Sequence, residues 1–137
     1  MRSITVAVCL DDRGGMLFFG RRQSRDRVLI SELIQSTEGK VYINKFSELL
    51  FEPHREHVVI CDDPMRECPD GGTVFVENLP LLPYFDDISQ IILYKWNKNY
   101  PSDKRIDIKF DAFRVVSDTA FVGSSHDKIN KVILKRR

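Results

Sequence analysis

Residues 3–18 read SITVAVCLDDRGGMLF, and this stretch decides the fold class that the sequence predicts. Ser3 to Leu10 is a continuous apolar run rich in Ile and Val. Such a run is typical of a strand that is buried on both faces, as in the parallel sheets of α/β proteins. Residues 11–15, DDRGG, are turn-forming, so we expect the strand to end there in a turn or loop. The prediction is an α/β domain with a mostly parallel central sheet.

The next apolar pattern along the chain has the spacing of a helix. Leu29, Leu33 and Ile34 fall on one face, which predicts a helix over residues 25–36. Ser24 is the predicted N-cap, because its hydroxyl can accept a hydrogen bond from a free N–H of the first turn. Glu38-Gly39 then ends the helix.

Further strands are expected downstream, separated by short helices and loops. The predicted elements are strands at 40–43, 57–61, 73–76 and 91–96, a short helix at 47–51 stopped by Pro53, and one helical turn within 80–87. Residues 113–117 and 129–135 alternate apolar and polar side chains, which indicates antiparallel strands with one face in water. The predicted architecture has three layers, with a mostly parallel sheet and an antiparallel C-terminal edge.

The composition is that of one globular domain, residues 1–137. Hydrophobic residues make up 42% and charged residues 30% of the chain, which argues against disorder. The formal net charge is +1, so the molecule as a whole does not attract nucleic acid or an anionic membrane. We find neither a signal peptide nor an apolar run of about 20 residues, and we expect a cytoplasmic protein with no membrane partner. The three cysteines do not suggest a disulfide framework.

The order of these segments resembles the dihydrofolate reductase family over nearly the whole chain. SITVAVCLDDRGGMLF is similar to that family's first strand and the loop over its active site. GKVYINKFS, residues 39–47, is similar to the strand that runs into Gly-Arg-x-Thr at a helix start, where the family binds the NADPH phosphates. Residues 91–108, FRVVSD and SSHDKINKVILKRR are similar to its last three strands. The resemblance implies a dihydrofolate reductase-like fold and places Asn44, Lys45 and Ser47 at the cofactor phosphates.

Three departures from the family pattern predict weak reductase activity or none. The stretch GRRQS replaces the Pro-Trp pair before the first helix. The position of the acid that holds the pterin falls at Val28 or Leu29, and an apolar side chain cannot make that charge-assisted bond. Asp26 would serve only if the helix register differed by almost a turn. Finally, Glu77-Asn78 replaces a Gly-Gly pair, where a carboxylate would crowd and repel a pyrophosphate.

Residues 21–27, RRQSRDR, place four arginines at the junction of a loop and a helix. Guanidinium groups and the free N–H groups of a helix start are suited to anions. We interpret Arg21 and Arg22 as ligands of a nucleotide or another phosphate-bearing molecule, with NADPH as a candidate cofactor. The alternative is a solvated basic face that is partly paired with nearby aspartates. For Lys45 and Ser47 the alternative is an ordinary helix cap beside an exposed lysine.

Two other groups of residues are weaker candidates for a functional site. His54, His57, Cys61 and Cys68 are of the types that bind zinc. His57 and Cys61 at the two ends of one strand would be about 13 Å apart, so we predict no metal site. Residues 124–126, Ser-Ser-His, are interpreted as a turn whose side chains satisfy backbone groups.

Three functions of different classes remain open. The first is a weak NADPH-dependent reductase, in which Asp26 is the only nearby candidate acid. The second is a non-catalytic relative that binds a nucleotide, another phosphate-bearing ligand or a protein partner, including a second copy of the chain. The third is RNA or DNA binding through residues 21–27. The departures favour the second, and the near-zero net charge disfavours the third.

Overall fold

The computed structural model describes residues 2–137, which form a mixture of strands, α-helices (α) and 3-10 helices (η). In chain order the elements are β1 (Ile4–Leu10), β2 (Gly15–Phe18), β3 (Arg21–Arg22), α1 (Arg27–Ser36), β4 (Val41–Ile43), η1 (Lys45–His57), β5 (Val58–Ile60), α2 (Pro64–Glu67), β6 (Thr73–Val76), η2 (Leu82–Asp87), β7 (Ile88–Lys95), β8 (Lys104–Arg105), β9 (Phe113–Phe121) and β10 (Ile129–Arg136).

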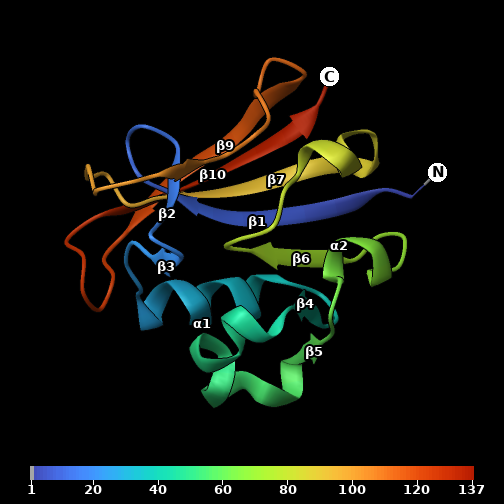
Figure 1. Ribbon diagram of the computed structural model, residues 1–137, viewed down its shortest axis with the longest axis horizontal. Helices are drawn as coiled ribbons and strands as arrows, with labels where there is room; N and C mark the ends of the chain where they lie inside the picture. Colours follow the sequence, from blue (N-terminus) through green and yellow to red (C-terminus); the bar gives the residue numbers. More distant parts are fainter. Residues whose placement is uncertain (1) are drawn as a thin grey trace.

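A seven-stranded sheet runs through the molecule in the order β5-β4-β6-β1-β7-β10-β9 (Figure 1). The strands from β5 to β7 pair in parallel, whereas β10 pairs antiparallel with both β7 and β9. The connections between the parallel strands must cross over the sheet, and they therefore carry helices or long loops. The prediction of a mostly parallel sheet with an antiparallel C-terminal edge is confirmed.

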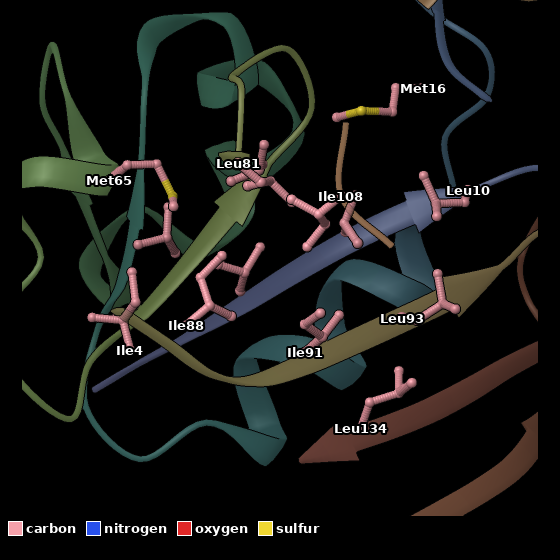
Figure 2. Packing of buried hydrophobic residues seen from close by; sticks show 14 of the residues in the cluster. Ile4, Leu10, Met16, Met65, Leu81, Ile88, Ile91, Leu93, Ile108 and Leu134 are labelled. Carbon is pink, nitrogen blue, oxygen red and sulfur yellow. The ribbon is translucent and has the colours of Figure 1, made fainter. Parts of the chain in front are cut away.

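Both faces of the parallel part of the sheet are buried, which explains the continuous apolar run at the N-terminus. Val6 and Val8 belong to a core cluster on one face, whereas Ala7 belongs to a second cluster on the other face. Helix α1 covers the second face with Leu29 and Leu33, both essentially inaccessible to solvent. Figure 2 shows the first cluster, in which side chains of β1 and β7 meet residues from the long loops, such as Leu81 and Ile108. The covering on that face is made mostly of loops and short helices.

The loops that follow the parallel strands gather at the end of the sheet where these strands have their carboxyl ends. A small three-stranded sheet, in the order β3-β2-β8, lies beside this end and was not predicted. The connection between β9 and β10 descends at the left of Figure 1 toward the start of α1. In open α/β sheets, the carboxyl ends of the strands are where ligands usually bind. The residues that the sequence pattern assigned to a phosphate-bearing ligand lie at this end of the sheet.

Several bounds differ from those expected. Strand β9 continues to Phe121 and β7 begins at Ile88, because pairing with β10 and β1 extends both strands beyond their apolar cores. Segment η1 does not stop before Pro53 but runs on to His57, with a non-helical backbone only at His54. No helix within residues 2–137 has the length and apolar character needed to span a bilayer.

Candidate functional site

Asp26 is the N-cap of α1, in place of the predicted Ser24. Its backbone is extended, with φ −154° and ψ 122°, and its Oδ1 accepts hydrogen bonds from the N–H groups of Val28 and Leu29 at 3.0 and 3.2 Å. Both serine and aspartate are good caps, so local sequence does not separate them. Asp26 therefore lies just before the helix, and its carboxylate already accepts hydrogen bonds from the first turn.

The connection between β9 and β10 closes over this carboxylate. The backbone N–H groups of Ser124 and Ser125 donate to its two oxygens at 2.9 and 2.8 Å, and the Ser124 hydroxyl adds a bond of 3.2 Å. Gly123 makes this approach possible, because a Cβ there would lie 2.7 Å from Cγ of Asp26 and 2.9 Å from Oδ1. The carboxylate thus joins the start of the first helix to a loop about a hundred residues later.

His126 completes the set of donors around Asp26. Its Nδ1 is 2.9 Å from Oδ2 of Asp26, and the two side chains are 2% and 0% exposed. Burial alone would raise the pKa of Asp26, but the bonds from His126 and from the N–H groups of the β9–β10 loop and α1 outweigh it and lower the pKa. Asp26 is therefore an ionised, fully paired carboxylate.

The other ring nitrogen of His126 faces two hydroxyl groups. Nε2 is 2.9 Å from Oγ of Ser24 and 3.2 Å from the hydroxyl of Tyr100. The imidazole stacks on Trp96, with 4.5 Å between the ring centroids. A carboxylate, an imidazole and a serine hydroxyl are consequently aligned, with the serine at the outer, half-buried end.

A second ionic cluster lies at the end of β6, where Glu77 interacts with residues predicted to hold a cofactor. Arg22 donates to both oxygens of Glu77, from Nε at 2.8 Å and from Nη2 at 3.0 Å. Ser47 donates to the same carboxylate at 2.8 Å instead of capping a helix. The hydrogen bond and charge of Glu77 raise the pKa of Arg22. Asn44 is held separately, through a bond of 2.9 Å from its amide to Asn78.

These residues do not fit NADPH phosphates in their present arrangement. Glu77 and Asn78 already use the donors of Arg22, Asn44 and Ser47, and the Glu77 carboxylate occupies the place of an anionic ligand. A pyrophosphate would have to displace that carboxylate and would be repelled by its charge. Cofactor binding by Arg21, Arg22, Asn44, Lys45 and Ser47 therefore stays a prediction.

The space between α1 and strands β1 and β6 is largely filled. A cavity of about 20 Å³ remains there, lined by residues that include Asp26, Glu77 and Trp96. This volume is room for roughly one water molecule. The cavity wall also contains Gln23, whose buried Oε1 has no hydrogen-bond partner among the described residues.

An open hollow lies outside this cavity. We call it the arginine hollow; it has a volume of about 830 Å³ and is lined by Gly20, Arg21, Arg22, Ser24, Arg25, Phe46 and Ser125. Arg22 stacks over the Phe46 ring, 4.9 Å from its centroid. The exposed side chains of Arg21 and Arg25 have no hydrogen-bond or ion-pair partner within residues 2–137, and the same is true of Lys45. The hollow therefore carries positive charge that the protein does not itself compensate.

The histidines and cysteines considered for zinc do not form a cluster. Within residues 2–137, no three His, Cys, Asp or Glu side chains lie together as metal ligands would. The three cysteines, Cys9, Cys61 and Cys68, are free thiols. Burial raises the pKa of each, to about 11 for Cys61, so they are protonated and weakly nucleophilic at neutral pH.

The sheet order and the two covering layers define the class of fold: the chain has the dihydrofolate reductase fold. One similar solved structure is dihydrofolate reductase from Enterococcus faecalis complexed with NADP(H) and RAB-propyl. It superimposes with a TM-score of 0.69 and 9% sequence identity, over 98% of this chain and 96% of that chain. No protein-family model and no curated protein sequence matches the chain. At this identity the likeness concerns the fold and not the activity.

Sequence reasoning missed the pairing of Asp26 with His126 and Ser24. Residues 124–126 are interpreted from the sequence as a turn whose side chains satisfy backbone groups. The Ser124 hydroxyl does accept a bond of 3.0 Å from the N–H of Arg27, and the N–H groups of Ser124 and Ser125 themselves donate to Asp26. No local spacing indicates the contact, because Asp26 and His126 are 100 positions apart. The usable signal was the sheet topology, which places the connection between the last two strands at the edge where the first helix begins.

Proposed function

We propose that this protein binds a phosphate-bearing ligand in the arginine hollow and does not carry out the reduction of a pterin by NADPH. The observation that carries the proposal is the pair of unpartnered guanidinium groups, Arg21 and Arg25, at one open hollow. Guanidinium groups bind phosphate through paired, charge-assisted hydrogen bonds. Ser24 and Ser125 line the same hollow and add uncharged polar residues to it.

Two features argue against the reductase reaction. Hydride transfer needs a nicotinamide and a pterin side by side, and the cavity between α1 and the sheet, lined by Asp26, Glu77 and Trp96, has only about 20 Å³ and accepts neither. The only acid near the helix start, Asp26, has both oxygens engaged by the helix, the β9–β10 loop and His126. The volume of the hollow, in contrast, is within the range typical of small-ligand sites.

Calorimetric titration with adenosine diphosphate tests the proposal, with adenosine as the ligand that lacks phosphate. We expect the diphosphate to bind and adenosine not to bind. Because a hydrogen bond to a charged group contributes about 1.5–3 kcal/mol, Arg21→Gln and Arg25→Gln should each weaken binding about tenfold or more. Arg66→Gln is the matched control, since Arg66 is an exposed arginine in α2, outside the hollow.

Equal affinity in the double variant Arg21→Gln/Arg25→Gln, or no binding at millimolar diphosphate, would remove the proposal. Binding of a labelled single-stranded RNA in place of the nucleotide, with a steep dependence on salt, would favour the RNA alternative. Oxidation of NADPH by dihydrofolate at an ordinary enzymatic rate would restore the reductase interpretation.

A further inference from the structure

Ser24, His126 and Asp26 are arranged in the order of a nucleophile, a base and an orienting acid. The distance from Ser24 Oγ to His126 Nε2 is 2.9 Å, and that from His126 Nδ1 to Asp26 Oδ2 is also 2.9 Å. Both are hydrogen-bond distances of the kind required for proton transfer along such a series. The acid and the imidazole are buried, whereas Ser24 is half-buried and lines the arginine hollow. Ser24 therefore lies between the hollow and the buried imidazole and carboxylate.

The hydrogen bonds around Asp26 determine which nitrogen of His126 is free to accept a proton. Asp26 has a lowered pKa and is ionised, so Nδ1 of the imidazole donates to it. In the neutral ring this leaves the lone pair on Nε2, which points at Ser24 and at Tyr100. Stacking on Trp96 holds the plane of the ring. The carboxylate and the indole thus fix both the tautomer and the orientation of the base.

The chain contains a second serine–histidine contact that lacks this support. Ser31 Oγ is 3.2 Å from Nε2 of His54, at the contact between α1 and η1. Within residues 2–137 no carboxylate is bonded to the imidazole of His54. Nothing selects its tautomer, and Ser31 therefore serves as an internal reference for a serine–histidine pair without an orienting acid.

We propose that Ser24 is a nucleophile for acyl transfer, with a carboxylic ester that bears an anionic group as the class of substrate. Ser24 Oγ forms a bond to the acyl carbon while its proton passes to Nε2 of His126. The bond from the acyl carbon to the alcohol oxygen then breaks, and the leaving alkoxide takes the proton from Nε2. Water then attacks the acyl carbon and gives a proton to Nε2 of His126. Ser24 Oγ leaves and takes that proton, which releases the acid and restores the free hydroxyl.

The arginine hollow supplies the electrostatic part of this reaction. Arg25 lines the hollow together with Ser24 and has no partner of its own among the described residues. Its positive charge favours both the anionic group of the ester and the negative charge that develops on the acyl oxygen. The proposed reactivity of Ser24 does not depend on the phosphate binding proposed above, and the two can fail separately.

Covalent labelling of the full chain with diisopropyl fluorophosphate tests the nucleophile. The reagent forms an Oγ–phosphorus bond and releases fluoride, and it carries no charge, so it does not need the arginines. We expect one adduct per chain in the intact mass, located at Ser24 by peptide mapping. Ser24→Ala should abolish it, and Ser31→Ala should leave it unchanged. Circular dichroism and the melting temperature of Ser24→Ala show whether the fold is retained.

Two further variants separate a catalytic role from a structural one. Because general-base assistance contributes about 100-fold or more, His126→Gln should slow labelling by at least that factor. Tyr100→Phe removes the hydroxyl that competes for Nε2, and it should leave the fold intact and label Ser24 about twofold faster. An unlabelled wild-type protein, an adduct on Ser31, or equal labelling in Ser24→Ala would each overturn the proposal, whatever the outcome for His126→Gln.

Hydrolysis of p-nitrophenyl acetate gives the matching turnover measurement. We expect slow release of p-nitrophenol that is lost in Ser24→Ala and retained in Arg66→Gln, since Arg66 lies outside the hollow. Release at the same rate in Ser24→Ala would contradict a serine nucleophile. Loss of diphosphate binding with intact labelling would reject the ligand proposal alone, whereas intact binding with no labelling would reject the nucleophile alone.

Discussion

Two carboxylates at the same sheet edge, Asp26 and Glu77, are neutralised in different ways. Asp26 receives four backbone N–H groups, two from α1 and two from the β9–β10 loop, in addition to the side chains of Ser124 and His126. Within residues 2–137, Glu77 is held only by side chains, those of Arg22 and Ser47. The position of the Asp26 carboxylate is therefore set largely by backbone groups, whereas that of the Glu77 carboxylate is set by two side chains that substitution can remove.

The difference shows which of the two belongs to the scaffold. Removing Asp26 leaves backbone N–H groups of two segments without an acceptor, and no neighbouring side chain can replace them. Removing Glu77 leaves a guanidinium that can bind another anion instead. Asp26 is thus expected to govern stability, and Glu77 to govern what the arginines can bind.

The largest expected effect comes from Asp26→Asn. The amide keeps one acceptor but places an NH₂ group against the N–H donors that Oδ2 now receives, and it removes the charge opposite His126. Breaking a buried, hydrogen-bonded pair costs about 3–5 kcal/mol, and we expect a loss of this size in urea denaturation. Asp127→Asn, an exposed aspartate in the same loop, is the control and should change stability little. Similar losses in the two variants would contradict a scaffold role for Asp26.

The contribution of Asp26 to stability also depends on pH. The pKa of Asp26 is lowered in the folded protein, so its contribution to stability is fully present above the unfolded value of about 3.9 and is lost as pH falls below it. We expect the difference in melting temperature between wild type and Asp26→Asn to narrow as the pH falls below about 4. A difference that stays constant to pH 3 would show that the charge of Asp26 is not what stabilises the fold.

A smaller effect is expected from Gly123→Ala. The new Cβ would contact the Asp26 carboxyl group, and either the loop or the side chain must shift. Overpacking of this kind costs about 1–3 kcal/mol. In an Asp26→Ala background the carboxyl group is absent, so the glycine substitution should then cost less than it does in the wild type. Strictly additive effects in this double-mutant cycle would contradict direct contact between the two residues.

The smallest change in stability should follow Glu77→Gln. The ion pair with Arg22 is partly exposed, at 22% and 10% for the two side chains, and its loss should cost about 1–2 kcal/mol. Freed from the carboxylate charge, Arg22 should strengthen binding of adenosine diphosphate about tenfold, which corresponds to about 1.4 kcal/mol. Glu38→Gln, an exposed site elsewhere, should alter neither quantity. Unchanged affinity in Glu77→Gln would place the ligand away from Arg22.

The sequence predicts the parallel strands well, because burial on both faces leaves a continuous apolar run. Strand β6 has the predicted bounds, Thr73–Val76, and α1 differs from its prediction only at the start. The short strands β3 and β8 could not be predicted. They consist of charged residues, and they exist only because β2 lies between them as a pairing partner.

The candidate site is predictable in part. The arginines of residues 21–27 and the unfavourable Glu77 are visible as residue types, and both lie at the expected edge. That Glu77 pairs with Arg22 is a tertiary contact between segments 55 positions apart, and no local pattern carries it. The same holds for the bond between Ser24 and His126, which spans 102 positions. Both pairings depend on the order of strands in the sheet.

The bonds between Asp26 and residues 124–126 have a consequence for synthesis of the chain. A ribosome adds about 5–20 residues per second, so a nascent chain carries Asp26 for roughly 5–20 s before its loop partners are made. During that interval the start of α1 has its own N-cap bonds but none from the loop. Translation must reach the last pair of strands before the start of α1 is held in its final position.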